Sequence, residues 1–255
     1  MSLLRLSSVT KNFGGLSAVS RLSFDLEEGV IMGLIGPNGA GKTTVFNLIT
    51  GIYRPESGEI VFNGRSLLQL STHRRVLLGI ARTFQTIRLF QNLSVIENVL
   101  AGCHCRLNAG ILSSFLRLPR QRREEREAVK KALDILALVG LGNGAEQLAK
   151  NLSYGNQRLL EIARAIAAEP RLLILDEPAS GMNESETRRL VSLVELIRDM
   201  GITVLIIEHD MALVMRACQH IVVMEYGRKI AEGTPDEIKR DNRVIEAYLG
   251  AENEY

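Results

Sequence analysis

A glycine-rich loop near the N-terminus constrains the fold of this chain more than any other feature. Residues 36–44 read GPNGAGKTT and fit the pattern G-x-x-x-x-G-K-[ST]. The apolar run 30–35 before the loop predicts a buried strand, and residues 43–50 predict a short helix that Gly51 ends. In such a setting the backbone N–H groups and the positive helix N-terminus can surround phosphate oxygens. The phosphate-binding residues are predicted to be Gly36, Pro37, Asn38, Gly39, Ala40, Gly41, Lys42, Thr43 and Thr44.

Two side chains of this loop have distinct predicted roles. Lys42 is expected to reach the terminal phosphates, and the Thr43 hydroxyl is expected to help hold Mg²⁺. The sequence therefore predicts a nucleoside-triphosphate site.

The composition is that of a globular chain without a bias toward particular partners. Its 255 residues are 46% hydrophobic and 24% charged, which is enough for a substantial core, and the net charge of +2 gives no general attraction to nucleic acid or anionic lipid. No stretch approaches about eighteen uncharged apolar residues, and the N-terminus is too short and polar for a signal peptide. We therefore expect a cytosolic chain. The three cysteines give no disulfide framework, and the spacing in Cys103-His104-Cys105 is wrong for a structural zinc.

The hydrophobic pattern predicts an α/β fold with two additions. Alternating apolar and polar residues over 3–28 and 58–64 predict a small antiparallel sheet around the nucleotide strand. Residues 95–150 are predicted to be mainly helical, beginning with a capping box formed by Ser94 and Glu97. Arginines and glutamates alternate near the middle of this segment, which favours a solvated helix face over a nucleic-acid patch.

The last third of the chain alternates strands and helices. The wholly apolar runs 172–175 and 204–207 predict strands covered on both faces. Together with the earlier segments this predicts a P-loop NTPase core with an antiparallel β subdomain over residues 1–90 and 160–255, and an inserted helical subdomain over residues 91–159.

Charged and polar residues follow the buried strands of the predicted core. Asp176-Glu177 ends the second strand and Glu208-His209-Asp210 ends the third. Because ligands bind at the carboxyl ends of strands in open parallel sheets, we expect these residues to share one edge with the phosphate loop. Asp176 suits Mg²⁺ and Glu177 suits a general base for the attacking water, although Glu177 could instead cap the next turn. His209 is expected to contact the γ-phosphate, with a packing role as the alternative.

A second candidate phosphate-binding element lies at residues 152–157, LSYGNQ, which we call the signature segment. It opens a predicted helix over residues 158–169. Ser153 can accept from helix N–H groups or donate to a phosphate, and Gly155 permits close backbone approach. Taken alone, the segment predicts only a helix cap.

In combination, these motifs resemble those of the ABC-type ATPases. The segments GPNGAGKTT, LSYGNQ, LLILDEP and IIEHD occur in the order and spacing of that family, and the resemblance covers essentially the whole chain. The specific part is LSYGN followed closely by LILDEP, since a phosphate loop alone is shared by many NTPases. The variants LSYG-x-Q, EPASGMN and LIIEHDM, with the arginine-rich helical insert, are most similar to the ATP-binding subunits of branched-chain amino-acid importers.

The resemblance implies further site residues. Phe13 matches the aromatic residue that stacks on adenine. Gln85 matches the glutamine that touches Mg²⁺ or its water and links to the helical insert. In this family the signature segment grips the γ-phosphate of ATP held by the other subunit, and the matching residues are Ser153, Gly155 and Gln157.

Three positions depart from the commonest family pattern. Tyr154 and Asn156 stand where glycine and glutamine are usual in the signature segment, and the tyrosine is familiar in the amino-acid-importer branch. Asn183 stands where aspartate usually ends the segment after the catalytic glutamate.

The resemblance also implies partners and location. The expected protein is a peripheral ATPase at the cytoplasmic face of the cell membrane, using ATP and Mg²⁺ to drive uptake of branched-chain or other hydrophobic amino acids. Its implied partners are a second ATPase subunit (as homodimer or heterodimer), separate transmembrane permease subunits and, indirectly, a solute-binding protein, with no nucleic acid.

Three other functions remain open at this stage. The motifs allow an ATPase of an ABC exporter or of a lipid or lipopolysaccharide transport system. A soluble cassette protein of DNA repair or translation usually has two cassettes or a long coiled coil, whereas only 111 positions separate Lys42 from Ser153 and no heptads are sustained between them. A small-metabolite phosphotransferase would not need the signature segment.

Overall fold

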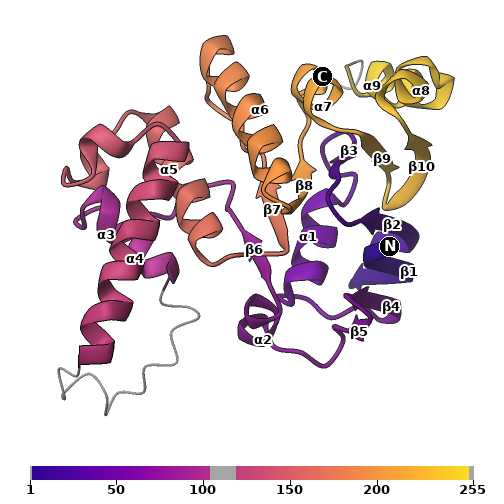
Figure 1. Ribbon diagram of the computed structural model, residues 1–255. Coiled ribbons are helices and arrows are strands. Elements are labelled where there is room, and N and C mark those ends of the chain that lie inside the picture. The colour runs from indigo at the N-terminus through magenta and orange to yellow at the C-terminus, as the bar shows by residue number, and fades with distance from the viewer. Residues whose placement is uncertain (1, 104–118, 253–255) are drawn as a thin grey trace.

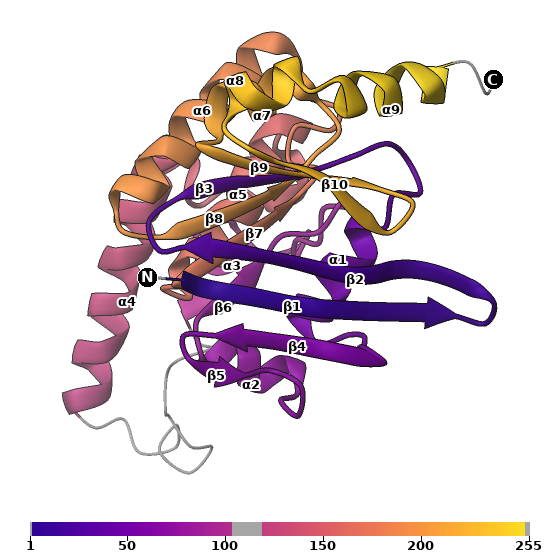
Figure 2. The same cartoon turned by 90° about the vertical axis from the view of Figure 1, so that its right-hand side faces the viewer.

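The computed structural model describes residues 2–103 and 119–252, which contain two sheets surrounded by helices (Figures 1 and 2). The smaller sheet is antiparallel and has the order β2-β1-β4-β5. Its strands are β1 (Ser2–Phe13), β2 (Leu16–Glu27), β4 (Ser57–Phe62) and β5 (Arg65–Ser66). The larger sheet has the order β10-β9-β3-β8-β7-β6 and is parallel except for β10 at one edge. Its strands are β3 (Ile31–Ile35), β6 (Ile80–Arg82), β7 (Leu172–Asp176), β8 (Thr203–Ile207), β9 (His220–Glu225) and β10 (Arg228–Gly233).

The helices fall into groups that follow the chain order. One group, α3, α4 and α5, packs together on one side of the molecule, and α8 and α9 lie beside the β9–β10 edge (Figure 1). The remaining helices α1, α2, α6 and α7 lie nearer the strands that precede or follow them. The bounds are α1 (Lys42–Thr50), α2 (Thr72–Leu77), α3 (Val95–Cys103), α4 (Pro119–Leu138), α5 (Tyr154–Ala167), α6 (Glu184–Asp199), α7 (Met211–Ala217), α8 (Pro235–Arg240) and α9 (Asn242–Glu252), with 3₁₀ turns at Gly142–Gly144 and Ala149–Asn151.

The larger sheet separates two hydrophobic clusters. Along β3, Ile31 and Ile35 belong to the cluster that also contains apolar residues of α3, α4, α5, α6 and α7. Met32 and Leu34 belong to the cluster formed with α1 and the smaller sheet. Because successive side chains of a strand point to opposite faces, a strand covered on both faces must be apolar throughout. Strands β3, β7 and β8 are accordingly buried along their whole length.

The structure confirms the predicted fold class and most of the predicted elements. The core strands, the antiparallel strands and the helices after the phosphate loop and after Asn183 lie where the pattern places them. The helix predicted over residues 158–169 begins earlier, at Tyr154, because Ser153 is its N-cap and accepts a hydrogen bond from the Asn156 N–H at 3.3 Å. Residues 154–157 of the signature segment therefore form the first turn of α5, and the helix ends at Ala167.

The helical segment has the predicted start. Ser94 N–H donates to Glu97 at 2.7 Å and the Ser94 hydroxyl accepts from the Glu97 N–H at 3.3 Å, which completes a capping box. Of the predicted arginine-rich insert, residues 104–118 lie outside the described part of the chain. No helix within residues 2–103 and 119–252 is long and apolar enough to cross a membrane.

Candidate phosphate site and the residues around it

The phosphate loop joins β3 to α1 and leaves the first turn of that helix open. The N-cap of α1 is Gly41, which has no side chain to bond the first-turn N–H groups. At Gly41 φ is 97°, and an added Cβ would lie 2.2 Å from the Ala18 carbonyl oxygen, so only glycine fits against β2. No acidic side chain lies in the first turn of α1. The helix N-terminus can therefore receive an anion.

Lys42 lies buried beneath this loop. Its Nζ donates to the carbonyl oxygens of Gly36 at 2.5 Å and Pro37 at 2.9 Å. Burial lowers the pKa of the Lys42 ammonium, and the negative charges of Glu177, Asp176 and Glu208 act against that shift. Lys42 is thus close to carboxylates at the carboxyl ends of β7 and β8.

Those carboxylates follow neighbouring strands, as the sequence predicts. Strand β8 lies between β3 and β7, with Leu34 beside Ile207 and Asp176 beside Ile207 on the other side. The Glu177 N–H donates to the Ile207 carbonyl at 2.8 Å, which extends the pairing by one residue. The carboxyl ends of β3, β8 and β7 therefore form one edge, which we call the rim.

Asp176 and Glu177 are consecutive but differ in surroundings. Asp176 is buried, and burial, followed by the charge of Glu177, raises the pKa of its carboxyl to about 6, against the opposing charges of Arg158 and Arg82. Glu177 has a left-handed backbone, with φ of 45°, and its side chain is 20% exposed. This conformation turns the Glu177 carboxylate away from the path of β7 and toward the open side of the rim.

Two side chains orient the Glu177 carboxylate. Gln85 Nε2 donates to Glu177 Oε2 at 2.8 Å. On the other side, His209 Nδ1 lies 3.7 Å from Glu177 Oε1 and 3.8 Å from Glu208 Oε2. His209 is 55% exposed, so it is free to approach a ligand, unlike a packed core histidine. The structure therefore brings Lys42, Gln85, Asp176, Glu177 and His209 together.

Glu208 is a site residue to which the sequence assigned no role. Its side chain is 1% exposed and accepts from the N–H groups of Ala179 at 3.0 Å, His209 at 3.0 Å and Asp210 at 3.3 Å. A buried carboxylate is stable when backbone donors surround it in this way. Glu208 fixes the turn after β7 to the turn after β8.

The signature segment lies apart from the rim within this chain. Its Ser153 oxygen accepts from Asn156, and Gln157 Nε2 donates to the Leu152 carbonyl at 3.0 Å. A Cβ at Gly155 would lie 2.3 Å from Glu186 Oε1, so α5 begins in close contact with the start of α6. Asn183, the departure from the family pattern, caps α6 in a box with Glu186.

Phe13, the residue predicted to contact adenine, lies beside a second aromatic ring. Phe13 ends β1 and is 42% exposed. The Tyr53 ring meets it edge-on at 5.1 Å between centroids, and Lys11 Nζ lies 5.2 Å from the Phe13 ring centre. Tyr53 lies shortly after α1 and gave no signal in the sequence. The Tyr53 ring lies nearly perpendicular to that of Phe13, which leaves the exposed Phe13 ring as the surface on which a flat base can stack.

A buried ion pair links α5 to the segment that carries Gln85. Arg158 is fully buried and donates to the carbonyls of Phe84 at 2.5 Å and Gln85 at 2.8 Å, and to Glu161 at 3.0 Å. Glu161 also accepts from the Arg88 N–H at 3.3 Å. Neither residue was predicted as a site residue, because an Arg and a Glu three positions apart on a helix usually form a surface pair. In the sequence, only the apolar residues around Arg158 and Glu161 indicate that these two side chains are buried.

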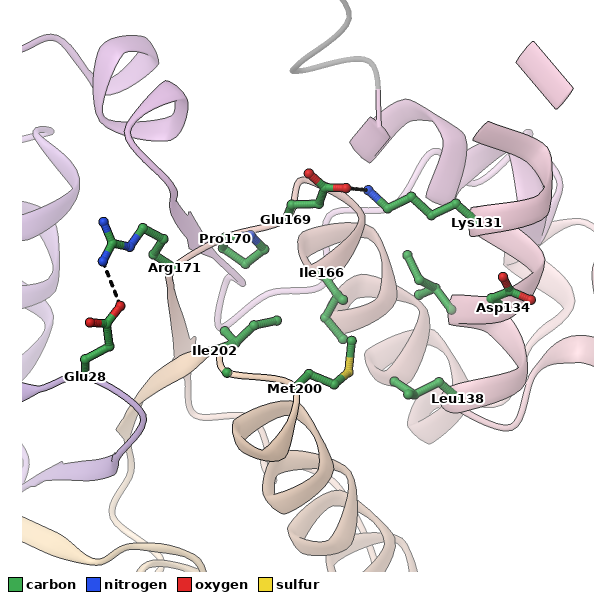
Figure 3. A pocket seen from close by; sticks show the side chains of 12 residues that line it. Glu28, Lys131, Asp134, Leu138, Ile166, Glu169, Pro170, Arg171, Met200 and Ile202 are labelled. Carbon is green, nitrogen blue, oxygen red and sulfur yellow. Dashed lines mark hydrogen bonds and ion pairs between the residues drawn. The ribbon is translucent and has the colours of Figure 1, made fainter. Parts of the chain in front are cut away.

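One pocket of about 540 Å³ lies at the opposite end of the strands (Figure 3). It is lined by residues of α4, by Arg171 at the start of β7 and by Gly201 and Ile202 before β8. Two ion pairs lie at this pocket. One joins Arg171 to Glu28 at 2.7 Å, and the other joins Lys131 to Glu169 at 2.6 Å. It lies at the amino ends of β7 and β8 and contains none of the predicted phosphate-binding residues.

A phosphate loop whose lysine lies among carboxylates from adjacent parallel strands defines a P-loop nucleoside triphosphatase. The family model described as ABC transporter matches residues 19–180, and the model described as branched-chain amino acid ATP-binding cassette transporter matches residues 228–254. The high-affinity branched-chain amino acid transport ATP-binding protein LivG of Salmonella typhimurium is 46% identical over 249 residues, covering 97% of this chain and 98% of LivG. The chain belongs to the ABC transporter family, as an ATP-binding protein of the branched-chain amino-acid transport type that hydrolyses ATP for transport.

Solved structures agree with this assignment. The ADP conformation of an ATP-binding cassette of an ABC transporter has a TM-score of 0.86 and 34% sequence identity, covering 98% of this chain and 99% of that one. A dimeric cassette in a post-hydrolysis state bound to ADP and Pi shares the fold, with a TM-score of 0.77, 23% identity and coverage of 91% and 98%.

Proposed function

We propose that this chain is the ATP-hydrolysing subunit of an importer for branched-chain or other hydrophobic amino acids, at the cytoplasmic face of the cell membrane. The observation that carries the catalytic part is the convergence of Lys42, Asp176 and Glu177 at the rim. The relatives' transport of branched-chain amino acids supports the substrate class. Separate permease subunits would span the membrane, and a solute-binding protein would deliver the amino acid to them.

In this proposal the chain's own residues perform each step of hydrolysis. Lys42 exchanges the Gly36 and Pro37 carbonyls for phosphate oxygens and offsets their charge. Glu177 accepts a proton from the water that attacks the γ-phosphorus, while the bond between that phosphorus and ADP breaks and ADP leaves. Gln85 holds the Glu177 carboxylate through its hydrogen bond, and His209 lies 3.7 Å from it. His209 also contacts the γ-phosphate. Adenine stacks on Phe13, beside Tyr53.

The residues around the rim also fit Mg²⁺. The Thr43 hydroxyl, the Asp176 carboxylate and the Gln85 amide oxygen are hard oxygen ligands of the kind Mg²⁺ prefers. Gln85 uses its Nε2 for Glu177, which leaves its amide oxygen for the metal or a metal-bound water. When bound with ATP, Mg²⁺ would neutralise phosphate charge during transfer.

We infer a dimer in which each site is shared. Ser153, Gly155 and Gln157 would bind the γ-phosphate of ATP held by a second ATPase subunit, either another copy or a related chain. Residues 91–159 would form a helical subdomain that moves against a core of residues 1–90 and 160–255 and pushes on the permease. ATP drives this motion only if it binds the closed dimer better than the open one.

The catalytic proposal is tested by Glu177→Gln. Loss of a general base typically slows a reaction by ~10²–10⁴-fold. We expect kcat for ATP to fall by at least about 100-fold while Mg-ATP binding is retained, measured by phosphate release and equilibrium binding. Glu184→Gln, on the exposed face of α6, is the matched control and should hydrolyse ATP at the normal rate. Undiminished steady-state hydrolysis by Glu177→Gln would refute the assignment.

The substrate class needs a separate measurement. The complex purified from membranes in mild detergent should contain permease subunits, and its reconstitution into liposomes should give ATP-dependent uptake of leucine but not of lysine. A Lys42→Ala complex should lose that uptake. Equal uptake of both amino acids, or outward transport alone, would contradict the import proposal.

A further inference from the structure

A groove between the two sheets is lined by polar and cationic side chains. Strands β2 and β10 are edge strands of the smaller and the larger sheet and lie side by side (Figure 2). The groove between them has a volume of about 550 Å³, which is within the range of small-molecule sites. Three of the described residues that line it are cationic and none has a carboxylate. They are Ser20, Arg21, Ser23, Arg228 and Lys229.

Two of these cations have no negative partner. Within the part of the chain that the structure describes, the guanidinium groups of Arg21 and Arg228 form no hydrogen bond or ion pair. The carboxylates on the same two strands are already engaged. Asp25 on β2 is paired with an arginine of β1 at 2.6 Å, and Glu232 on β10 is paired with Lys229. The groove therefore holds two guanidinium groups whose N–H donors are available to an anion from outside the chain.

The serines of the groove add further donors. Ser23 Oγ accepts from the Ser8 N–H at 2.7 Å, which leaves the Ser23 hydroxyl proton for a ligand. The Ser20 N–H donates to the Gly227 carbonyl at 2.8 Å, and this bond joins the two strands beside the groove. Hydroxyl and guanidinium donors together suit a ligand that presents several negatively charged oxygen atoms.

Both strands depart from regular pairing at this groove. On β2, Ser20 and Arg21 together face the single residue Thr10 of β1, and Arg21 has a left-handed φ of 50°. On β10, the register with β9 shifts between Lys229 and Ala231. Bulges of this kind change the direction of neighbouring side chains and are common beside functional sites.

We propose that the groove between β2 and β10 is a second anion site, which binds the phosphate groups of a ligand between Arg21 and Arg228. A phosphate group carries more charge than a carboxylate, which matches three cations in one groove, and guanidinium groups bind its oxygens in pairs. The phosphate can belong to a soluble phosphorylated compound or to the headgroup of an anionic lipid.

The groove adjoins the nucleotide site but shares no lining residue with the phosphate loop. The Gly227 N–H donates to the Ala40 carbonyl of that loop at 3.1 Å, while the Gly227 carbonyl accepts from Ser20. This single residue separates the two sites. The second anion site thus goes beyond the proposed function, in which none of the residues lining the groove takes part.

The first arm of the test is the binding of inorganic pyrophosphate, measured by calorimetry in magnesium-free buffer. Every protein in this arm carries Lys42→Ala, which weakens anion binding at the phosphate loop. Adding Arg21→Gln/Arg228→Gln should lower the affinity for pyrophosphate at least about 10-fold, because two charge-assisted contacts are lost. Both arginines are exposed, so Tm should not change.

The second arm uses vesicles of phosphatidylcholine with or without phosphatidylglycerol. If the ligand is a lipid headgroup, the protein should co-sediment with the vesicles that contain phosphatidylglycerol, and Arg21→Gln/Arg228→Gln should reduce this binding. A loss confined to pyrophosphate would assign a soluble ligand, and a loss confined to the anionic vesicles would assign a lipid headgroup.

The matched control is Arg65→Gln/Arg74→Gln, which removes the same charge from exposed positions outside the groove and should keep the binding of both probes. With Lys42 intact, neither pair of substitutions should change kcat for ATP, so this test does not depend on the proposed function. Unchanged binding of both probes after Arg21→Gln/Arg228→Gln would overturn the proposal. Equal losses in the two double variants, or binding of neither probe by the Lys42→Ala protein, would also overturn it.

Discussion

At the scale of single residues, two adjacent carboxylates at the end of β7 are prepared for different tasks. Asp176 is enclosed and Glu177 is more open, although they share a peptide bond. The buried carboxylate suits a metal-linked role, whereas the more open one, hydrogen-bonded by Gln85 and 3.7 Å from His209, suits contact with water. The left-handed φ at Glu177 makes the difference possible, because regular strand geometry would continue the ladder instead of turning into the rim.

The raised pKa of Asp176 predicts a pH-dependent stability. In metal-free buffer the folded protein holds this proton up to about pH 6, whereas the unfolded chain loses it near the ordinary value of 3.8. The group therefore reduces stability as pH rises between those values, and the full cost remains above pH 6. Asp176→Asn should increase the free energy of unfolding at pH 7 by about 1–3 kcal/mol, since one pKa unit corresponds to about 1.4 kcal/mol, and should abolish Mg²⁺-dependent hydrolysis.

Urea unfolding at pH 4 and pH 7 would measure this difference. The variant's advantage should shrink toward pH 4, because the folded protein keeps the Asp176 proton there and the unfolded chain has regained a large part of it. Asp199→Asn, at the exposed end of α6, should show no comparable gain. A metal-free Asp176→Asn protein less stable than the parent at pH 7 would mean that the ionised carboxylate stabilises the fold.

At the scale of elements, α5 and the segment after β6 behave as one unit. Arg158 bonds the carbonyls of Phe84 and Gln85, and Gln85 in turn bonds Glu177. Two hydrogen-bonded links, from Arg158 to the Gln85 backbone and from the Gln85 side chain to Glu177, therefore connect α5 to the rim. Since α5 also begins with the signature segment, this chain of contacts connects that segment to Glu177 at the rim.

Arg158→Met should break this link and destabilise the fold. Removing one member of a buried ion pair typically costs ~3–5 kcal/mol, because Glu161 is left buried with the Arg88 N–H as its remaining described donor. The double variant Arg158→Met/Glu161→Leu should recover much of the stability, yet its kcat should stay low because Gln85 is no longer fixed. Chemical denaturation and phosphate release measure the two effects.

A surface pair provides the comparison. Arg188→Met breaks the exposed contact with Glu184 on α6 and should change stability by about 0.5 kcal/mol or less. If the double variant at positions 158 and 161 hydrolysed ATP at the parental rate, Arg158 would serve packing alone.

The same elements show what the sequence could and could not predict. The common edge of Lys42, Asp176 and His209 follows from the rule for parallel strands, and the structure places them there, while their chemical roles remain predictions. Strand β6, with three residues, and the partly exposed edge strand β10 lack a long apolar pattern, so neither was predicted. The contact between the Phe13 and Tyr53 rings depends on packing between separate segments, which periodicity does not report.

At the scale of the whole molecule, the signature segment is the feature on which the proposed dimer depends. Ser153 bonds its own helix, and Gly155 faces Glu186 of the same chain. None of the hydrogen bonds of the described residues joins this segment to the phosphate loop. In the proposed two-fold dimer, a second subunit would bring a signature segment to each bound ATP, and the dimer would hold two such sites.

Mixing two inactive variants would test this arrangement. Ser153→Arg blocks the signature segment and Lys42→Ala disables the phosphate loop, so each homodimer should be inactive. A heterodimer would retain one site with both elements intact. Random pairing should restore about a quarter of the parental rate, because half of the dimers are mixed and each has one working site of two. Complete inactivity of a mixture with verified heterodimers would exclude shared sites.

The three backbone hydrogen bonds that Glu208 accepts restrict how the molecule can change shape. They join the backbone of the turn that carries Glu177 to the backbone of the turn that carries His209. In the proposed function, a rearrangement around the nucleotide would then move these two turns together, relative to the Gln85 segment and the phosphate loop. The relative position of the two turns would thereby be set when the chain folds.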